Sequence, residues 1–138
     1  MSRVQRGSTF LGFEFFWGND RKGERRVQRR TSRKKLRNSL ANFTQWCKQS
    51  RPMPLRRLFP LLKSKLRGYY NYYGVPGNWY GLREFFEPSM KILWKWLNRR
   101  SQRRSFTWQG FADLLNHFHV PRPRITVRPR IRQAVYSP

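Results

Sequence analysis

The chain has 138 residues, a length that suits a single domain. Lys and Arg number 31 against 6 Asp and Glu, which gives a formal net charge of +25 at pH 7. A compact protein with such a charge repels itself and favours a polyanionic partner. Phe, Trp and Tyr make up 17% of the residues, which argues against a disordered basic tail. The single cysteine, Cys47, excludes a disulfide scaffold.

The hydropathy pattern gives no sign of a membrane segment. No apolar run reaches the roughly 18 residues that a membrane-spanning helix needs. The first residues are not followed by the apolar stretch of a secretory signal. We therefore expect a cytoplasmic protein without a membrane partner.

Residues 1–30 are predicted to contain a β-hairpin. Aromatic side chains crowd residues 10–16, which favours a strand, and a Gly-Asn-Asp sequence at 18–20 together with Gly23 supplies turn chemistry. The return strand over 24–30 is nearly all polar. Because a two-stranded hairpin is marginally stable alone, we expect its sheet partners to belong to a larger protein upstream.

Residues 31–120 are predicted to form a helical domain, because apolar residues recur at helical spacing in four segments. Pro60 and Pro88 lie inside two of these patterns. Each proline can kink its helix, mark a later start or divide the pattern into two shorter helices. The four segments are 32–49, 55–73, 79–99 and a last one that begins after Thr107.

Each predicted helix has an expected cap and an expected buried stripe. A Ser, Thr or Asn side chain before a helix accepts hydrogen bonds from the free amides of the first turn, which points to Thr31 or Ser32, Asn78 and Thr107. The stripes predict a core that includes Leu36, Leu40, Phe43, Cys47, Leu58, Phe59, Leu62, Leu66, Trp79, Leu82, Phe86, Leu93, Leu97, Trp108, Phe111, Leu114, Leu115 and Phe118.

The C-terminal residues 121–138 differ in character from the helices. Arg alternates with apolar residues there, and several prolines remove backbone donors. We expect an extended basic arm that does not pack on the domain. The predicted fold class is therefore mainly α, with an N-terminal β-hairpin, a bundle of three to four helices and an extended basic C-terminal arm.

The acidic residues and histidines do not form a catalytic or metal-binding pattern. Only two aspartates exist, and they lie far apart in sequence, so no Asp pair is available to hold metal ions for nucleotidyl transfer. Glu84 and Glu87 lie beside Arg83, which favours a surface ion pair. His117 and His119 fall at a predicted helix end without a cysteine cluster. We expect no catalytic residues, no metal and no cofactor.

Basic residues instead gather in three places, each suited to nucleic acid. Arg predominates over Lys, and its planar guanidinium binds phosphates and stacks on bases. In the tyrosine run at 69–73, Tyr69 and Tyr73 fit the core stripe, whereas Tyr70 and Tyr72 point elsewhere and are available to stack on bases. The candidate RNA-binding residues are Arg33, Lys34 and Arg37, then Lys63, Arg67, Asn71 and Tyr72, then Asn98, Arg99, Arg100, Arg103 and Arg104.

Four sequence motifs, in this order, resemble the C-terminal part of a bacterial group II intron reverse transcriptase/maturase. They are Phe-Leu-Gly-Phe-Glu-Phe at 10–15, Arg-Gly-Tyr-Tyr-Asn-Tyr-Tyr-Gly at 67–74, Leu-Asn-Arg-Arg-Ser-Gln-Arg at 97–103 and Pro-Arg-Pro-Arg-Ile at 121–125. The first motif is common to many reverse transcriptases. The second and third together are more specific to the maturase domain.

The resemblance implies a location in the parent protein and a partner. It implies that residues 1–30 correspond to the last strands of the palm, and that the helices correspond to the thumb, also called the maturase or X domain. In that family this region binds group II intron RNA, assists its folding and splicing, and grips the RNA/DNA template–primer duplex. The positions that carry over as RNA contacts are Arg67, Asn71, Tyr72, Asn98, Arg99 and Arg100.

The chain departs from the family in lacking the Tyr-Ala-Asp-Asp motif of its polymerases, the fingers and most of the palm. We therefore expect no enzymatic activity from this chain alone. The primary hypothesis is an RNA-binding maturase domain. One alternative is the thumb of a split or truncated RNA-directed DNA polymerase, active only with an upstream reverse transcriptase half. Another is a structural RNA-binding protein like those of the ribosome.

Overall fold

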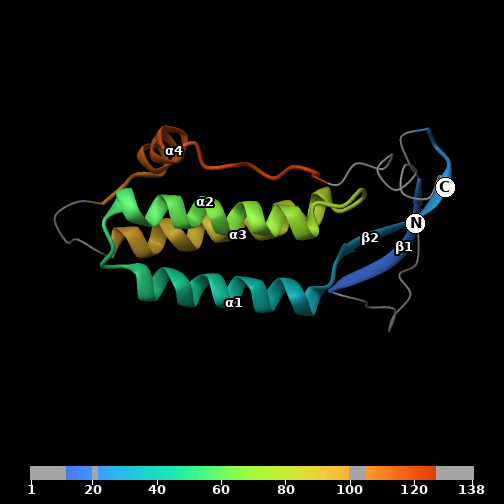
Figure 1. The fold of residues 1–138 in the computed structure, drawn as a ribbon, viewed down its shortest axis with the longest axis horizontal. Helices are drawn as coiled ribbons and strands as arrows, with labels where there is room; N and C mark the ends of the chain where they lie inside the picture. The colour runs from blue at the N-terminus through green and yellow to red at the C-terminus, as the bar shows by residue number, and fades with distance from the viewer. Residues whose placement is uncertain (1–11, 20–21, 100–104, 127–138) are drawn as a thin grey trace, which may run out of the picture.

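The computed structural model describes residues 12–19, 22–99 and 105–126. Within these residues a two-stranded antiparallel hairpin precedes four helices (Figure 1). The predicted mainly helical fold with an N-terminal hairpin is confirmed. The elements are β1 (Phe13–Asn19), β2 (Arg25–Thr31), α1 (Arg33–Ser50), α2 (Leu55–Tyr73), α3 (Trp79–Asn98) and α4 (Trp108–His117).

The three long helices run side by side along the longest axis, and the hairpin extends from one end of them (Figure 1). The chain travels away from the hairpin along α1, returns along α2 and travels away again along α3. The end of α1, the start of α2 and the end of α3 therefore meet at the far end of the bundle, which we call the distal end. The shorter α4 packs near this end against α2, where Phe59 stacks on Phe118 with ring centroids 4.3 Å apart.

Two of the predicted caps are confirmed, and one has a different role. The Ser32 hydroxyl accepts a hydrogen bond from the Lys35 amide, and the Thr107 hydroxyl accepts one from the Gly110 amide. Asn78 precedes α3 as expected, but its side chain makes no capping bond. That side chain is engaged elsewhere, in a buried junction.

The Asn78 junction joins the hairpin to the helices. Asn78 is fully buried, and its Oδ1 accepts from the Thr31 amide at 2.8 Å. Its Nδ2 donates to Thr31 Oγ1 and to the Tyr73 carbonyl, each at 2.8 Å. A Cβ on Gly81 would collide with Asn78 Oδ1, so the first turn of α3 needs a glycine there. One side chain thus ties together the ends of β2 and α2 and the start of α3.

Neither proline ends a helix. Pro60 lies inside α2, which begins at Leu55, and Pro88 lies inside α3, which is undivided. A proline in a helix interior costs about 3 kcal/mol. Buried apolar residues flank both prolines, and each contributes about 1.5–3 kcal/mol on burial, so packing outweighs the local penalty. Those flanking residues are Leu58, Phe59, Leu62, Phe85, Phe86 and Met90.

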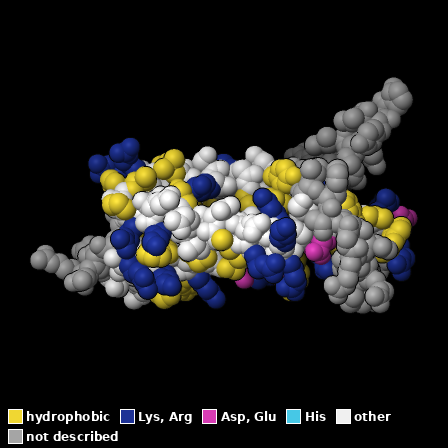
Figure 2. Space-filling view, turned by 90° about the horizontal axis from the view of Figure 1, so that it is seen from below, with side chains coloured by type: hydrophobic (Ala, Val, Ile, Leu, Met, Phe, Trp, Pro, Cys, Tyr) yellow, Lys and Arg dark blue, Asp and Glu magenta, His cyan; other side chains and the backbone are white. Residues whose placement is uncertain are grey.

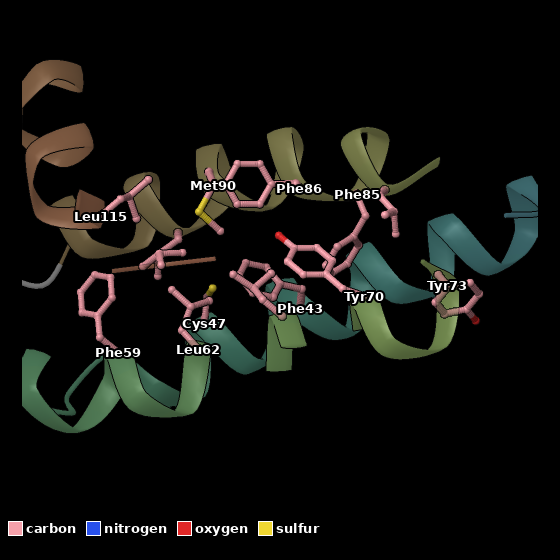
Figure 3. Close-up of a cluster of buried hydrophobic side chains, with 14 of the residues drawn as sticks. Phe43, Cys47, Phe59, Leu62, Tyr70, Tyr73, Phe85, Phe86, Met90 and Leu115 are labelled. Carbon is pink, nitrogen blue, oxygen red and sulfur yellow. The ribbon is translucent and has the colours of Figure 1, made fainter. Parts of the chain in front are cut away.

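The core is a row of aromatic and aliphatic side chains between the long helices, with Leu115 added by α4 (Figure 3). Cys47 is buried in this row as predicted, and burial raises the pKa of its thiol to about 12. Two predicted core residues lie at the surface instead, because Trp79 is 51% exposed and Trp108 is 47% exposed. Both lie in the first turn of a helix, and Trp108 covers only part of its ring by an edge-on contact with Trp94 of α3, with centroids 5.2 Å apart.

The structure contradicts the prediction that Tyr70 points away from the core. Its side chain is 1% exposed and points into the core (Figure 3), so it is not available to stack on bases. The Tyr70 hydroxyl donates to the Pro121 carbonyl at 2.8 Å. Burial raises the pKa of this phenol, while the nearby Arg122 and Arg124 lower it in part. The sequence suggested an outward side chain because it does not show what covers this side of α2.

The segment that covers it is the start of the predicted arm. Residues 121–126 are extended, as expected, but they pack along α2, contrary to the prediction. Thr126 donates its amide to the Gly74 carbonyl and its hydroxyl to the Tyr70 carbonyl. A Cβ on Gly74 would meet Thr126 Oγ1 at 2.8 Å and the Arg124 carbonyl at 2.9 Å, so only glycine fits. The rest of the arm, 127–138, lies outside the described residues.

Replacing Leu93 by alanine is expected to destabilise the bundle. Leu93 is 1% exposed, so truncation removes buried apolar contacts and leaves a cavity that costs about 2–5 kcal/mol. Leu40 is only partly buried against the core, so Leu40→Ala is expected to cost less. Urea denaturation of both variants tests this order, and an equal loss would contradict the assigned burial.

Candidate nucleic-acid interface

The outward side of α1 is an exposed basic surface without acidic residues. Residues 33–50 contain no Asp or Glu. The apolar side of the helix faces the core through Leu36, Leu40, Phe43 and Cys47, which leaves its polar residues outside. Lys35 is exposed at one flank of the helix, beside Tyr69 and Tyr72. We call the other exposed polar residues the α1 face: Arg33, Lys34, Arg37, Asn38, Asn42, Gln45, Lys48 and Gln49.

The charges of the α1 face lie toward its two ends. Arg33, Lys34 and Arg37 are in the first turns and Lys48 is in the last, with amide side chains between them. Figure 2 views the molecule from the α1 side and shows Lys and Arg gathered toward both ends of this face. None of these four cations forms an ion pair with a described residue. Their charge is therefore available to an outside anion.

The acidic residues are held elsewhere. Glu14 pairs with Arg30 and Glu24 with Arg26 on the hairpin, and Glu87 pairs with Arg83 at 2.7 Å on α3. The last of these confirms the predicted surface ion pair. Glu84 and Glu87 line a shallow groove of about 560 Å³ beside Leu36 and Leu40. Glu84 and Glu87 thus lie in a groove between α1 and α3, and the outward side of α1 itself carries no acid.

The second predicted group is divided between two surfaces. Lys63, Arg67 and Asn71 follow one another at a spacing of four residues on one side of α2, and Arg67 and Asn71 are exposed. Tyr72 is 48% exposed, but its ring stacks on Phe13 of the hairpin, with centroids 5.9 Å apart and planes 9° from parallel. The side chain of Tyr72 therefore lies apart from the Arg67 side of the helix.

The third predicted group contains one residue with an internal role. Asn98 Oδ1 accepts from the Phe106 amide at 2.7 Å, and its Nδ2 donates to the Phe106 carbonyl at 3.2 Å. Asn98 thereby links the end of α3 to Phe106, so its amide has a structural role within the chain. Arg99 is exposed. Arg100, Arg103 and Arg104 lie outside the described residues.

Sequence reasoning missed the basic residues of the distal end. Arg51 follows α1, and Arg56 and Arg57 open α2, all of them exposed. The start of α2 and the end of α3 lie at the same end of the bundle (Figure 1), and the Arg51 guanidinium lies 5.7 Å from the ring centroid of Trp96 on α3. One signal was available, because no Asp or Glu occurs between Glu24 and Glu84. An acid-free run of that length makes every basic residue in it a candidate.

The exposed side chains of the α1 face are of kinds that contact phosphate and sugar groups. Guanidinium and ammonium groups neutralise phosphates, and Asn and Gln side chains hydrogen-bond to phosphate and sugar oxygens. Within residues 12–19, 22–99 and 105–126, no three His, Cys, Asp or Glu side chains gather as ligands for a metal ion would. The helices of these same segments also include none that is apolar and long enough to cross a bilayer.

Comparison of the chain with protein-family models, curated proteins and solved structures finds no match.

Proposed function

We propose that the chain is an RNA-binding maturase domain that binds group II intron RNA through the α1 face and assists its folding and splicing. The observation that carries the proposal is the composition of this face, in which exposed cations and amides occur without an acid. The motif order at 10–15, 67–74, 97–103 and 121–125 supports the choice of RNA.

Replacing Arg33 and Arg37 together by glutamine is expected to weaken RNA binding and reduce its dependence on salt. Each lost phosphate contact releases about one counterion fewer, so the slope of log affinity against log salt falls by roughly 1.5. Fluorescence anisotropy with a group II intron transcript across a salt series measures both the affinity and this slope. The matched control is Arg83→Gln with Lys91→Gln on α3, which removes the same charge beside Glu84 and Glu87.

Two outcomes of that series would count against the proposal. If both double variants lower the salt slope equally, the chain binds RNA as a general polycation and the α1 face is not a specific binding surface. If the unmodified chain binds a tRNA as tightly as the intron transcript, a general structural RNA-binding protein becomes the better description. Thermal melting of each variant shows whether the fold is intact.

A second candidate function is the thumb of a split RNA-directed DNA polymerase. Among the described residues, β1 and β2 pair only with each other, so β1 has an edge to which a further strand could be added, whereas Gly77 and Asn78 cover the end of β2. An upstream fingers–palm polypeptide would extend this sheet and supply the polymerase aspartates. Primer extension on an RNA template, with that polypeptide alone and with the chain added, tests this function. An equal rate in both reactions would contradict it.

A further inference from the structure

Two arginines from different helices converge on one tryptophan at the distal end. The guanidinium carbon of Arg51 lies 5.7 Å from the centroid of the Trp96 ring, and that of Arg99 lies 5.1 Å from it. Arg51 follows the end of α1 and Arg99 follows the end of α3, 48 residues later in the numbering. The fold therefore brings together two cations that the sequence keeps far apart.

The tryptophan holds both side chains in place. Trp96 is half-buried and packs against the core, so its ring is fixed. A guanidinium over an aromatic face is attracted by the negative potential of the ring and loses part of its freedom before any ligand arrives. Such preorganisation lowers the entropic cost of binding. The outer sides of both arginines remain exposed.

The surroundings leave these charges uncompensated. Neither Arg51 nor Arg99 forms an ion pair with a described residue. Residues 44–59 and 91–99, which α1, α2 and α3 bring to the distal end, contain no Asp or Glu. The acidic residue of α4, Asp113, forms no ion pair with a described residue. Arg56 and Arg57 add two cations in the first turn of α2, where the helix dipole is also positive. Two cations on one tryptophan ring, without a counterion among the described residues, favour an anion that can approach both.

We infer that Arg51 and Arg99, held by Trp96, form a clamp for neighbouring phosphates of one RNA strand. This inference rests on the proposed RNA-binding function and adds a second contact at the opposite end of the bundle from Arg33 and Arg37. A phosphodiester backbone suits the clamp because it offers one negative charge at each nucleotide. An arginine fork donates two hydrogen bonds to each phosphate. The clamp therefore positions the RNA without reading its sequence.

The test distinguishes the effect of the arginine charges from the effect of holding those arginines against Trp96. Arg51→Gln with Arg99→Gln is expected to lower the salt slope for the intron transcript by roughly 1.5, as two phosphate contacts are lost. Trp96→Leu keeps the charges of Arg51 and Arg99 but removes the ring that restrains these two side chains. It is expected to weaken binding roughly three- to tenfold at constant salt with a nearly unchanged slope. Trp96→Phe keeps an aromatic ring and is expected to fall in between.

The outcomes distinguish the clamp from the proposed function. The first outcome concerns an unmodified chain that prefers the intron transcript over tRNA. If the Arg51/Arg99 variant then has the same salt slope as the Arg83/Lys91 control, the clamp is wrong, while the proposed binding through the α1 face is unaffected. If Trp96→Leu melts like the unmodified chain and binds as tightly, the tryptophan does not position the arginines and the clamp is again wrong. Should Trp96→Leu fail to fold, Trp96→Phe and the arginine variant decide. If the unmodified chain binds the intron transcript and tRNA equally tightly, the proposed function itself is overturned.

Discussion

Asn78→Ala is expected to lower the free energy of unfolding by about 3–5 kcal/mol. The substitution removes three hydrogen bonds of 2.8 Å from a fully buried site. The Thr31 amide then loses its partner away from water, which costs about 1–3 kcal/mol. The Tyr73 carbonyl keeps its hydrogen bond from the Val75 amide, so the other two lost bonds cost about 0.5–1.5 kcal/mol each. Urea denaturation followed by circular dichroism measures the change.

The matched control for this junction is Asn71→Ala on the same stretch of chain. Asn71 is exposed, so its loss is expected to change the free energy of unfolding by less than about 0.5 kcal/mol. Gly81→Ala offers a second approach to the junction, because the added Cβ collides with Asn78 Oδ1. An Asn78→Ala variant as stable as the control would mean that the hairpin and helices do not depend on this side chain.

Phe59→Ala is expected to cost about 3–5 kcal/mol, the second large effect. Phe59 is completely buried, and its ring lies 4.3 Å from that of Phe118 with the two planes 1° from parallel. Truncation removes the side chain that joins α2 to the end of α4 and leaves a cavity at the distal end. Thermal and urea unfolding both report the loss.

Leu61→Ala serves as the comparison for Phe59→Ala. Leu61 lies two residues further along α2 but is 45% exposed, so its truncation removes little buried surface. The loss is expected to stay below about 1 kcal/mol. Limited proteolysis adds an independent readout, because release of α4 exposes residues 105–126 to cleavage. Equal stability of the two variants would contradict the packing of α4 on α2.

These two positions also affect how the RNA experiments are read. Neither Asn78 nor Phe59 is exposed, so neither can contact RNA directly. Weakened binding in these variants would follow from loss of the fold, whereas the Arg33/Arg37 variant is expected to bind less and melt unchanged. The combination separates residues that build the bundle from those that present charge on it.

Local sequence patterns determined most of the secondary structure. The spacing of apolar residues predicted all four helices close to their observed bounds, and the hydroxyls of Ser32 and Thr107 were recognisable as caps. These features depend on neighbours within a turn or two, which the sequence displays directly. The excess of basic residues likewise follows from composition and sets the class of partner.

The candidate site was predictable only in part. Arg33, Lys34 and Arg37 were found from their clustering and are exposed on one helix side. Asn98 carried the same signal, yet its side chain binds Phe106. Arg51 carried no such signal, because its partner Trp96 lies on another helix. Clustering along the chain identifies charge, but it does not show which charges share a surface.

The tertiary structure alone decided the contacts between distant segments. It buried Tyr70 under residues 121–126, drew the Asn78 side chain into a junction with Thr31, and brought Arg51 and Arg99 to the Trp96 ring. Each of these contacts joins elements whose relative placement depends on how the whole core packs. Periodicity states which side of a helix is apolar, but only the packed bundle determines which segment covers that side and which polar groups it leaves for a partner.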